Sequence, residues 1–435
     1  MRTLLPLLAA AVLTATLVQP AAAADNPTWS PALSSGSGVG VAVQGGAARI
    51  DQRTAFRAPR EDAAAEGTPD TAVATGLLTL DPHRLDSPTN RIAARVAARL
   101  TEGATATVDV RGLRASGNWS EWIPADDGTA VLPEPVIDVQ ARLVLTGDPG
   151  PEATGLTLTA LASVQVEGAR AEADPLSYKI FATREGLVGG TTANGHVITP
   201  HDRFVALPSR RALSPNGSSD YSVRICAPNG RCAFAPVWDV GPWNIKDDYW
   251  NAGRQQWRDL PQGTPQAQAA FRNGYNGGKD GFDRKIVNPA GIDLADGTFY
   301  NVGLNNNGWV TVTYLWTGGG GSGPSVTGMS QCATSSNADC YSAAAGNGSD
   351  CHTGHFCIYT GTNYSGTVFS FYHCKYNGGD WALQNWLSAG SYINDNSGGT
   401  DAYTKDANHN VITATTPGSR STNYNFDPVY YVQAC

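Results

Sequence analysis

Residues 233–243 read AFAPVWDVGPW, an apolar run that contains one carboxylate and ends in a Gly-Pro turn. Because successive side chains of a strand point to opposite faces, this pattern predicts a strand on which Asp239 and Trp238 face opposite ways. The strand should end at the Gly-Pro pair, since proline donates no ladder hydrogen bond. Asp239 is therefore expected at the end of a strand, beside Trp238 and Trp243.

A second carboxylate has a similar setting. Residues 291–296, GIDLAD, place Asp293 on the strand face opposite its aliphatic neighbours, and residues 309–316 form the next apolar strand. A carboxylic acid can protonate a glycosidic oxygen at neutral pH if burial or a neighbouring like charge raises its pKa. Asp239 is the first candidate for this role and Asp293 the second. The alternative is structural, since an Asp at a strand end often accepts hydrogen bonds from turn amides.

Several short motifs follow one another in the region 175–317. They are TTANG at 191–195, Leu-Pro at 207–208, DVGPW at 239–243, IDL at 292–294 and the strand at 309–315. In this order they resemble the double-psi β-barrel of rare lipoprotein A and the expansins. The resemblance implies a barrel that acts on cell-wall polysaccharide, either as a lytic transglycosylase on peptidoglycan or as an expansin-like loosening protein.

The resemblance also implies residue roles. Asp239 would be the general acid and base, Asp293 a secondary candidate, and Thr183, Trp238 and Trp243 would bind substrate. This chain departs from the family pattern where Val240 replaces an Arg, where Gly291 replaces a His, and in its long interval 244–289. That interval contains a predicted helix with Thr264 as N-cap and Pro265 in its first turn.

The whole chain is rich in turn-forming residues. Gly 49 and Pro 26 among 435 residues favour many turns over long helices, so the expected fold class is mainly β. At roughly one to two hundred residues per domain, the length predicts several domains. The formal net charge is −8, so the chain lacks the excess of basic residues that binding to nucleic-acid phosphates requires. No nucleic-acid partner is therefore expected.

The first 24 residues have the pattern of a secretory signal peptide. Arg2 precedes an apolar run from Leu4 to Val18, and small residues follow before Asp25. The mature chain is then expected to be secreted, either released or associated with the cell wall. No later segment has the roughly 20 apolar residues of a membrane helix, so no membrane attachment is expected after signal removal.

The mature chain divides by composition into three regions and a linker. The first region has alternating apolar segments that predict a β-sandwich behind a flexible start. Its residues Trp119 and Trp122 are three apart, so on a strand they face opposite ways, and at least one is expected in the core rather than on a sugar. The predicted divisions are a β-sandwich at 25–172, a double-psi β-barrel at 175–317, a Gly/Ser linker at 318–330 and a disulfide-rich module at 331–435.

Eight cysteines in an exported chain predict disulfides rather than metal ligands. Cys226 and Cys232 flank an Asn-Gly turn and predict a hairpin with its own disulfide. The pairing of the other six stays open; they are Cys332, Cys340, Cys351, Cys357, Cys374 and Cys435. No metal site and no cofactor are predicted.

The third region has the motifs FCIY at 356–359, NYSG at 363–366 and SYIND at 391–395, and it ends in a Cys. These resemble the βγ-crystallin-like module of microbial metalloproteinase inhibitors. The resemblance implies a compact β module and inhibition of a secreted metallo- or cysteine protease.

Three functions therefore compete. The leading hypothesis is an exported protein whose barrel binds cell-wall polysaccharide, with cleavage left open. The first alternative is a secreted protease inhibitor that uses the C-terminal or the barrel module. The second is a non-catalytic structural protein of the wall. Nothing in the sequence determines the oligomeric state.

Overall fold

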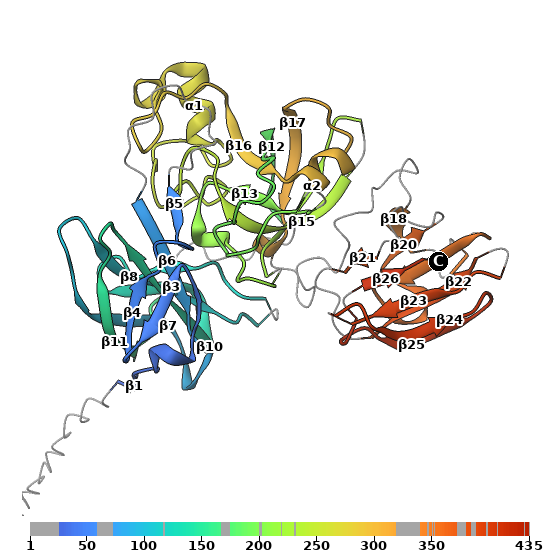
Figure 1. Cartoon of the computed structure of the whole chain (residues 1–435), viewed down its shortest axis with the longest axis horizontal. Coiled ribbons are helices and arrows are strands. Elements are labelled where there is room, and N and C mark those ends of the chain that lie inside the picture. The colour runs from blue at the N-terminus through green and yellow to red at the C-terminus, as the bar shows by residue number, and fades with distance from the viewer. Residues whose placement is uncertain are drawn as a thin grey trace, which may run out of the picture.

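The structure is a computed structural model of the chain. It describes residues 26–58, 73–115, 118–166, 175–199, 202–218, 220–229, 232–318, 340–345, 348–349, 351, 353–371, 380–383, 389–396, 399–406, 408–429 and 431–434. The predicted signal peptide, nearly all of the predicted linker, and Cys332, Cys374 and Cys435 lie outside these residues. The described residues form mainly β-structure in several sheets, one of them a closed barrel, which confirms the expected fold class (Figure 1).

The N-terminal region forms one antiparallel sheet, with the main strand order β2-β6-β10-β7-β11-β4-β3. Its two longest strands are β7 (His83–Arg99) and β10 (Thr129–Thr146), and register shifts between Val131 and Asp138 interrupt their pairing. Inward-facing residues such as Ile92 form its core. The other elements are β1 (Thr28–Trp29), η1 (Leu33–Ser35), β2 (Ser37–Val39), β3 (Val41–Gln44), β4 (Ala47–Ile50), β5 (Phe56–Ala58), β6 (Val73–Thr79), β8 (Thr105–Gly112), β9 (Ile123–Pro124) and β11 (Glu152–Leu161).

The central region forms a closed barrel in the order β12-β16-β13-β15-β14-β17. Two pairs are parallel, β12 with β16 and β13 with β15, and the remaining pairs are antiparallel. Buried aliphatic and aromatic side chains from the six strands form its core. The elements are β12 (Ser177–Arg184), β13 (Val205–Leu207), η2 (Arg210–Ala212), β14 (Ser222–Cys226), β15 (Cys232–Val240), β16 (Ala290–Leu294), α2 (Asp296–Asn301), β17 (Gly308–Tyr314) and η4 (Leu315–Thr317).

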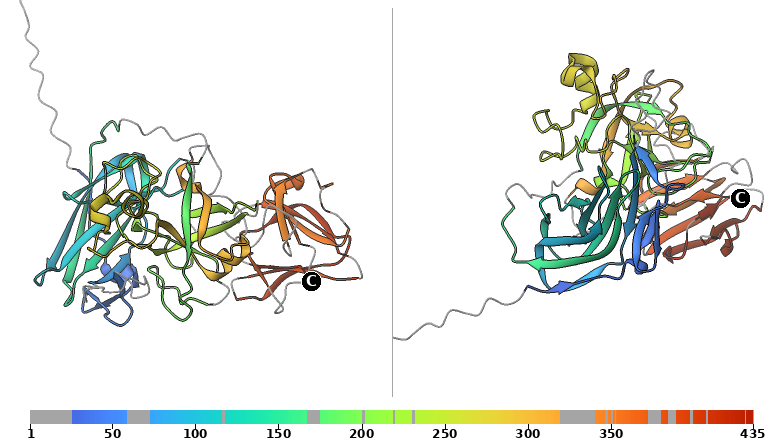
Figure 2. Two further views of the ribbon diagram at one scale, coloured as in Figure 1. Left: turned by 90° about the horizontal axis from the view of Figure 1, so that it is seen from above. Right: turned by 60° about the vertical axis from the view of Figure 1, so that its left-hand side comes forward.

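A long insertion between β15 and β16 carries α1 (Gln266–Asn273) and η3 (Tyr275–Gly278), and it projects from the barrel in both Figure 1 and Figure 2. The helix starts at Gln266, later than the predicted cap at Thr264, because Pro265 is still extended and makes no side-chain cap. Instead, the carboxylate of Asp247 accepts a hydrogen bond of 2.7 Å from the Gln266 N–H, which satisfies a first-turn amide.

The C-terminal region consists of two antiparallel sheets. One has the order β18-β20-β19-β22-β25 and the other β21-β26-β23-β24. The core of this region includes Phe356, Phe369 and Trp381. The elements are β18 (Cys340–Ala344), β19 (His355–Tyr359), η5 (Thr362–Tyr364), β20 (Thr367–Phe371), β21 (Trp381–Ala382), β22 (Ala389–Asp395), β23 (Ala402–Lys405), β24 (Val411–Thr415), β25 (Arg420–Asn425) and β26 (Tyr431–Gln433).

The N-terminal region inserts a tryptophan into the barrel core. Trp122 is fully buried among barrel residues and donates its indole N–H to the Leu213 carbonyl at 3.2 Å. Beside it, one carboxylate oxygen of Glu121 accepts the indole N–H groups of Trp250 at 2.6 Å and Trp316 at 2.8 Å. The expectation that at least one of the two N-terminal Trp residues is core is therefore confirmed, although the core that Trp122 joins is that of the next domain.

Buried ion pairs cross the same interface. Asp109 accepts hydrogen bonds from Arg142 of its own domain at 2.7 Å and from Arg210 of the barrel at 3.1 Å. Burial by itself would raise the pKa of Asp109, but the two guanidinium groups outweigh it and hold the pKa below its usual value of 3.8. Paired charges and aromatic rings thus hold the N-terminal sheet and the barrel together.

Candidate functional site

The strand register brings the predicted acidic residues together at one end of the barrel. Thr183 on β12 pairs with Asp293 on β16, and Asp293 pairs in turn with Ala206 on β13. Ala206 also pairs with Asp239 on β15. Four neighbouring strands therefore contribute one row of residues, Thr183–Asp293–Ala206–Asp239, which contains two carboxylates that are far apart in the sequence.

This row opens into a cavity of about 230 Å³. Thr183, Asp239 and Asp293 line it together with Trp243, which follows the Gly-Pro turn. Four of the five predicted catalytic or substrate-binding residues thus lie at one site. Among the described residues, no group of three or more His, Cys, Asp or Glu side chains is arranged to hold a metal ion.

Asp239 is fully buried at the base of this cavity. Its Oδ1 accepts two main-chain hydrogen bonds of 2.8 Å, from the N–H groups of Ala193 and Val240. Ala193 belongs to the TTANG segment, so Asp239 ties that loop to the end of β15. This geometry supports the alternative that Asp239 has a structural role and accepts hydrogen bonds from turn amides. An oxygen held by two amide donors is not placed to deliver a proton to a ligand.

Asp293 is the more accessible of the two carboxylates. Its side chain is half-buried, and its Oδ1 accepts a hydrogen bond from the Thr183 hydroxyl across the parallel pair β12–β16. The Thr183 side chain is itself largely buried, so water competes little for this hydrogen bond. The hydroxyl therefore orients the Asp293 carboxylate toward the cavity. Asp293 and Thr183 form the polar pair that a ligand in the cavity would meet.

Aromatic and guanidinium groups from the insertion also line the cavity. Trp243 has a φ of 62°, a left-handed conformation that costs a non-glycine residue about 1–2 kcal/mol. It is held by a hydrogen bond from its indole N–H to Asn288 at 3.1 Å and by Arg284, which donates to its carbonyl at 2.7 Å. The Arg284 guanidinium lies 5.6 Å from the Trp243 ring and 5.5 Å from that of Phe282.

Trp238 was predicted to bind substrate, but its side chain does not line the cavity. Its ring lies 4.7 Å from His196 and 5.9 Å from Phe204, and its indole N–H donates to the Ser218 carbonyl at 2.9 Å. The reason is the strand period, because neighbouring residues of β15 face opposite sides and Asp239 takes the cavity side.

Several residues that line the cavity were not predicted. Phe56 comes from β5 of the N-terminal region and lines the same cavity as Asp239 and Asp293. Arg284 lies in the long insertion, where its neighbour Phe282 also reaches the cavity. The interval 244–289 was recognised as unusually long, which was a usable signal for a segment that reshapes the site. No local pattern pointed to Phe56.

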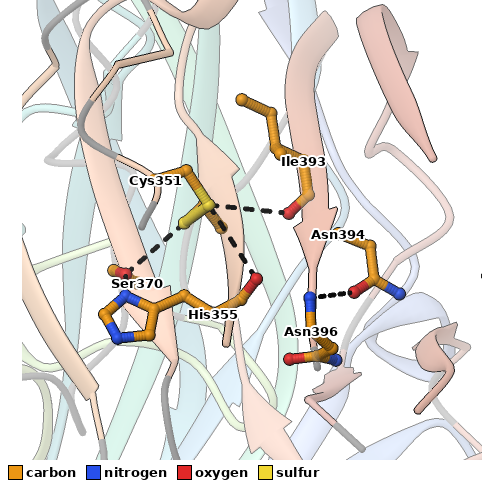
Figure 3. The surroundings of a disulfide bond; sticks show 7 residues. Cys351, His355, Ser370, Ile393, Asn394 and Asn396 are labelled. Atoms are coloured by element: carbon orange, nitrogen blue, oxygen red, sulfur yellow. Dashed lines mark hydrogen bonds between the residues drawn. A yellow bond between two sulfur atoms is a disulfide. The ribbon is translucent and has the colours of Figure 1, made fainter. Parts of the chain in front are cut away.

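The described disulfide of the C-terminal region joins Cys351, which precedes β19, to Cys357 in the middle of that strand (Figure 3). Ser370 on the adjacent strand β20 lies 2.9 Å from the ring of His355 and 3.4 Å from the sulfur of Cys357. The disulfide therefore closes a short loop onto β19, the central strand of its sheet. It resolves one pairing that the cysteine pattern left open.

In the barrel, Cys226 is also disulfide-bonded, and the strand register places Cys232 directly opposite it, as the hairpin prediction required. Cys340 is the first residue of β18.

The barrel and the C-terminal region match the models of two different families. Residues 176–313, nearly the whole barrel, match the model of a family described as a domain of unknown function (DUF8814). Residues 344–412 match that of peptidase inhibitor family I36. No curated protein matches the chain. None of the described helices is long and apolar enough to cross a membrane.

The described residues thus form a β-protein in which a barrel with an acidic cavity precedes a C-terminal region that matches a peptidase inhibitor family model. The match of residues 344–412 confirms that the C-terminal region resembles an inhibitor family.

Proposed function

We propose that the protein is a peptidase inhibitor that acts through its C-terminal module. The observation that carries this proposal is the match of residues 344–412 to peptidase inhibitor family I36. A protease partner follows from it. The metallo- or cysteine-protease class is the finer part of the proposal and rests on the resemblance of the FCIY, NYSG and SYIND motifs to microbial metalloproteinase inhibitors.

The geometry of the module supports this role. An inhibitor that binds in place of a substrate should lose little conformational entropy on binding. Its binding segment should also unfold locally only rarely, so a rigid surface is favoured. The turn at 360–366 is rigid in this sense: Ser391 donates to the Gly361 carbonyl at 2.7 Å and accepts from the Tyr364 N–H at 2.9 Å. The Cys351–Cys357 disulfide stiffens the neighbouring loop.

The test is a titration of the full-length mature chain against a purified zinc metalloprotease, a papain-type cysteine protease and a serine protease, each with a fluorogenic peptide. We expect dose-dependent inhibition of the metallo- or the cysteine protease. The Cys351→Ser variant should inhibit more weakly, whereas Asp239→Asn, in the barrel, should inhibit like wild type. Full protease activity at about 10 μM chain, a concentration far above typical inhibitor dissociation constants, would overturn the proposal.

For the barrel we propose a second function, the binding of cell-wall glycan. The specific observation in its favour is the row of Thr183, Asp293 and Asp239, which lines one cavity with Trp243. The closed six-strand barrel with two parallel pairs is consistent with a double-psi architecture. Binding is favoured over cleavage because Oδ1 of Asp239 is engaged by two main-chain amides.

The glycan proposal is tested by sedimentation with purified peptidoglycan, followed by mass spectrometry of the supernatant. We expect wild type to bind, Asp293→Asn to bind more weakly, and no anhydro-sugar product to form. Release of anhydro-sugars by wild type but not by Asp239→Asn would instead establish a lytic transglycosylase. Both functions require an extracellular protein, which the signal-peptide pattern supports; N-terminal sequencing of the secreted chain should begin at Asp25.

A further inference from the structure

We infer that the N-terminal domain forms part of the barrel's binding site, so that an extended, uncharged oligosaccharide lies along the boundary between the two domains. This inference rests on the glycan-binding function proposed for the barrel. To that function it adds the path that the ligand follows and a role for the N-terminal domain. It also names residues that contact the ligand in addition to Asp239 and Asp293.

The first observation is the position of Phe56. Strand β5 pairs with β6 of the N-terminal sheet and reaches toward the barrel (Figure 1). The Phe56 side chain packs against a small apolar cluster that joins the domains and includes Leu77 of the sheet and Val240 of the barrel. It also lines the cavity that holds Asp239 and Asp293. The cavity is therefore incomplete without the N-terminal domain.

The second observation is an adjacent hollow of about 480 Å³. It shares Asn244, Ile245 and Phe282 with the first cavity, so the two lie side by side. Here too the N-terminal domain supplies a wall, through the exposed residue Asp126. The first cavity alone is smaller than the roughly 300 Å³ at which sites for small ligands begin, so the pair fits a ligand that extends from one into the other.

The lining of the two hollows indicates the class of ligand. Amide side chains can donate and accept hydrogen bonds, as sugar hydroxyls do, and aromatic rings offer flat apolar faces to sugar rings. The second hollow carries Gln255 and Gln256, and Gln255 Oε1 has no hydrogen-bond partner within the described part of the chain. Asn244 also lines it, but its amide already donates to Gln266 and accepts from the Gly281 N–H. The two charged side chains of this hollow, Asp126 and Lys246, have opposite signs.

The domain interface holds this arrangement in place. Trp122 is buried in the barrel core, and Asp109 pairs with Arg142 of its own domain and with Arg210 across the boundary. A site built between two firmly packed domains is formed before the ligand arrives, so binding loses little free energy to reorganisation. Phe56 is thus a positioning residue for the ligand rather than a catalytic one.

The experiment measures the dissociation constants of the full mature chain for N-acetylglucosamine oligomers of increasing length, by isothermal titration calorimetry. Wild type should bind longer oligomers more tightly than the dimer. Phe56→Leu keeps apolar bulk but removes the ring face, and it should weaken binding at every length by about two- to tenfold. Gln256→Ala, which changes only the second hollow, should weaken the longer oligomers and leave the dimer unchanged.

Two controls separate this contact from an effect on folding. Phe56→Tyr should restore the affinity, because it restores the ring. Phe271→Ala removes an exposed aromatic of α1 that lines neither hollow, and it should bind like wild type. Binding by wild type that is unchanged in Phe56→Leu and Gln256→Ala would overturn this inference and leave the barrel function standing. No binding of any oligomer, nor of peptidoglycan, by wild type would overturn both.

Discussion

Replacement of Trp122 by Ala should destabilise the barrel although Trp122 belongs to the N-terminal domain. Truncating a fully buried Trp costs about 3–5 kcal/mol. The indole also donates to the Leu213 carbonyl, a hydrogen bond worth about 1 kcal/mol, and it packs against the guanidinium groups of Arg111 and Arg142, each 4.3 Å from the ring. Both arginines keep polar partners, so we expect a total loss of about 5 kcal/mol.

The assay is equilibrium unfolding in urea, followed by circular dichroism and by tryptophan fluorescence. In wild type the N-terminal sheet and the barrel should unfold in one transition, and in Trp122→Ala the midpoint should fall sharply or the transition should split. Trp119→Ala is the matched control, because Trp119 is half-buried and contacts only one of these guanidinium groups, that of Arg111 at 4.5 Å. A loss in Trp122→Ala below about 2 kcal/mol, or no larger than in the control, would refute the reasoning.

Three further predictions concern stability. Asp239→Ala should lower the free energy of unfolding by about 3 kcal/mol, because the buried N–H groups of Ala193 and Val240 lose their acceptor. Asp239→Asn keeps an oxygen at that position and should cost less than half as much. Equal losses of the two variants in thermal unfolding would contradict the anchoring role. The folded-state pKa of Asp109 is depressed, so its contribution to stability is present above the ordinary value of 3.8 and is lost as the pH falls through the lower folded value. The urea midpoints of wild type and Asp109→Asn should therefore differ at pH 7, and the difference should shrink as the pH falls below 3.8; a difference that stays constant would argue against this. Replacing Cys351 and Cys357 by Ser should destabilise the C-terminal module by about 2 kcal/mol, the value for a short closed loop, with faster proteolysis of that module in the full chain; an unchanged cleavage rate would count against it.

The elements of the barrel could be predicted from the sequence to a large extent. The run at 233–243 forms β15, which ends at Val240 before the Gly-Pro pair, and residues 291–294 lie in β16 with Asp293 facing away from its aliphatic neighbours. The hairpin between Cys226 and Cys232 also pairs as the Asn-Gly turn indicated. These features depend on residues close together in the chain, and that is why periodicity finds them.

The candidate site was only partly predictable. The sequence named Asp239, Asp293, Thr183 and Trp243, but their order along the chain says little about which strands become neighbours. It also placed Trp238 at the site, although that side chain lies on the other face of β15. The predicted start of α1 was one residue early: Pro265 rather than Thr264 is the N-cap, and the Gln266 amide takes its acceptor from Asp247, far from the helix in sequence.

The amino-acid sequence by itself determined a mainly β protein, the carboxylates near the ends of two strands, and the resemblance of the C-terminal region to an inhibitor family, because alternation, turn residues and motif spacing are local properties. Only the tertiary structure decided that β13 lies between β15 and β16, that Phe56 reaches the acidic cavity, and that Trp122 enters the barrel core. Those contacts join segments far apart in the chain, and they form only when closure of the barrel and burial of apolar surface between domains offset the entropy of bringing them together.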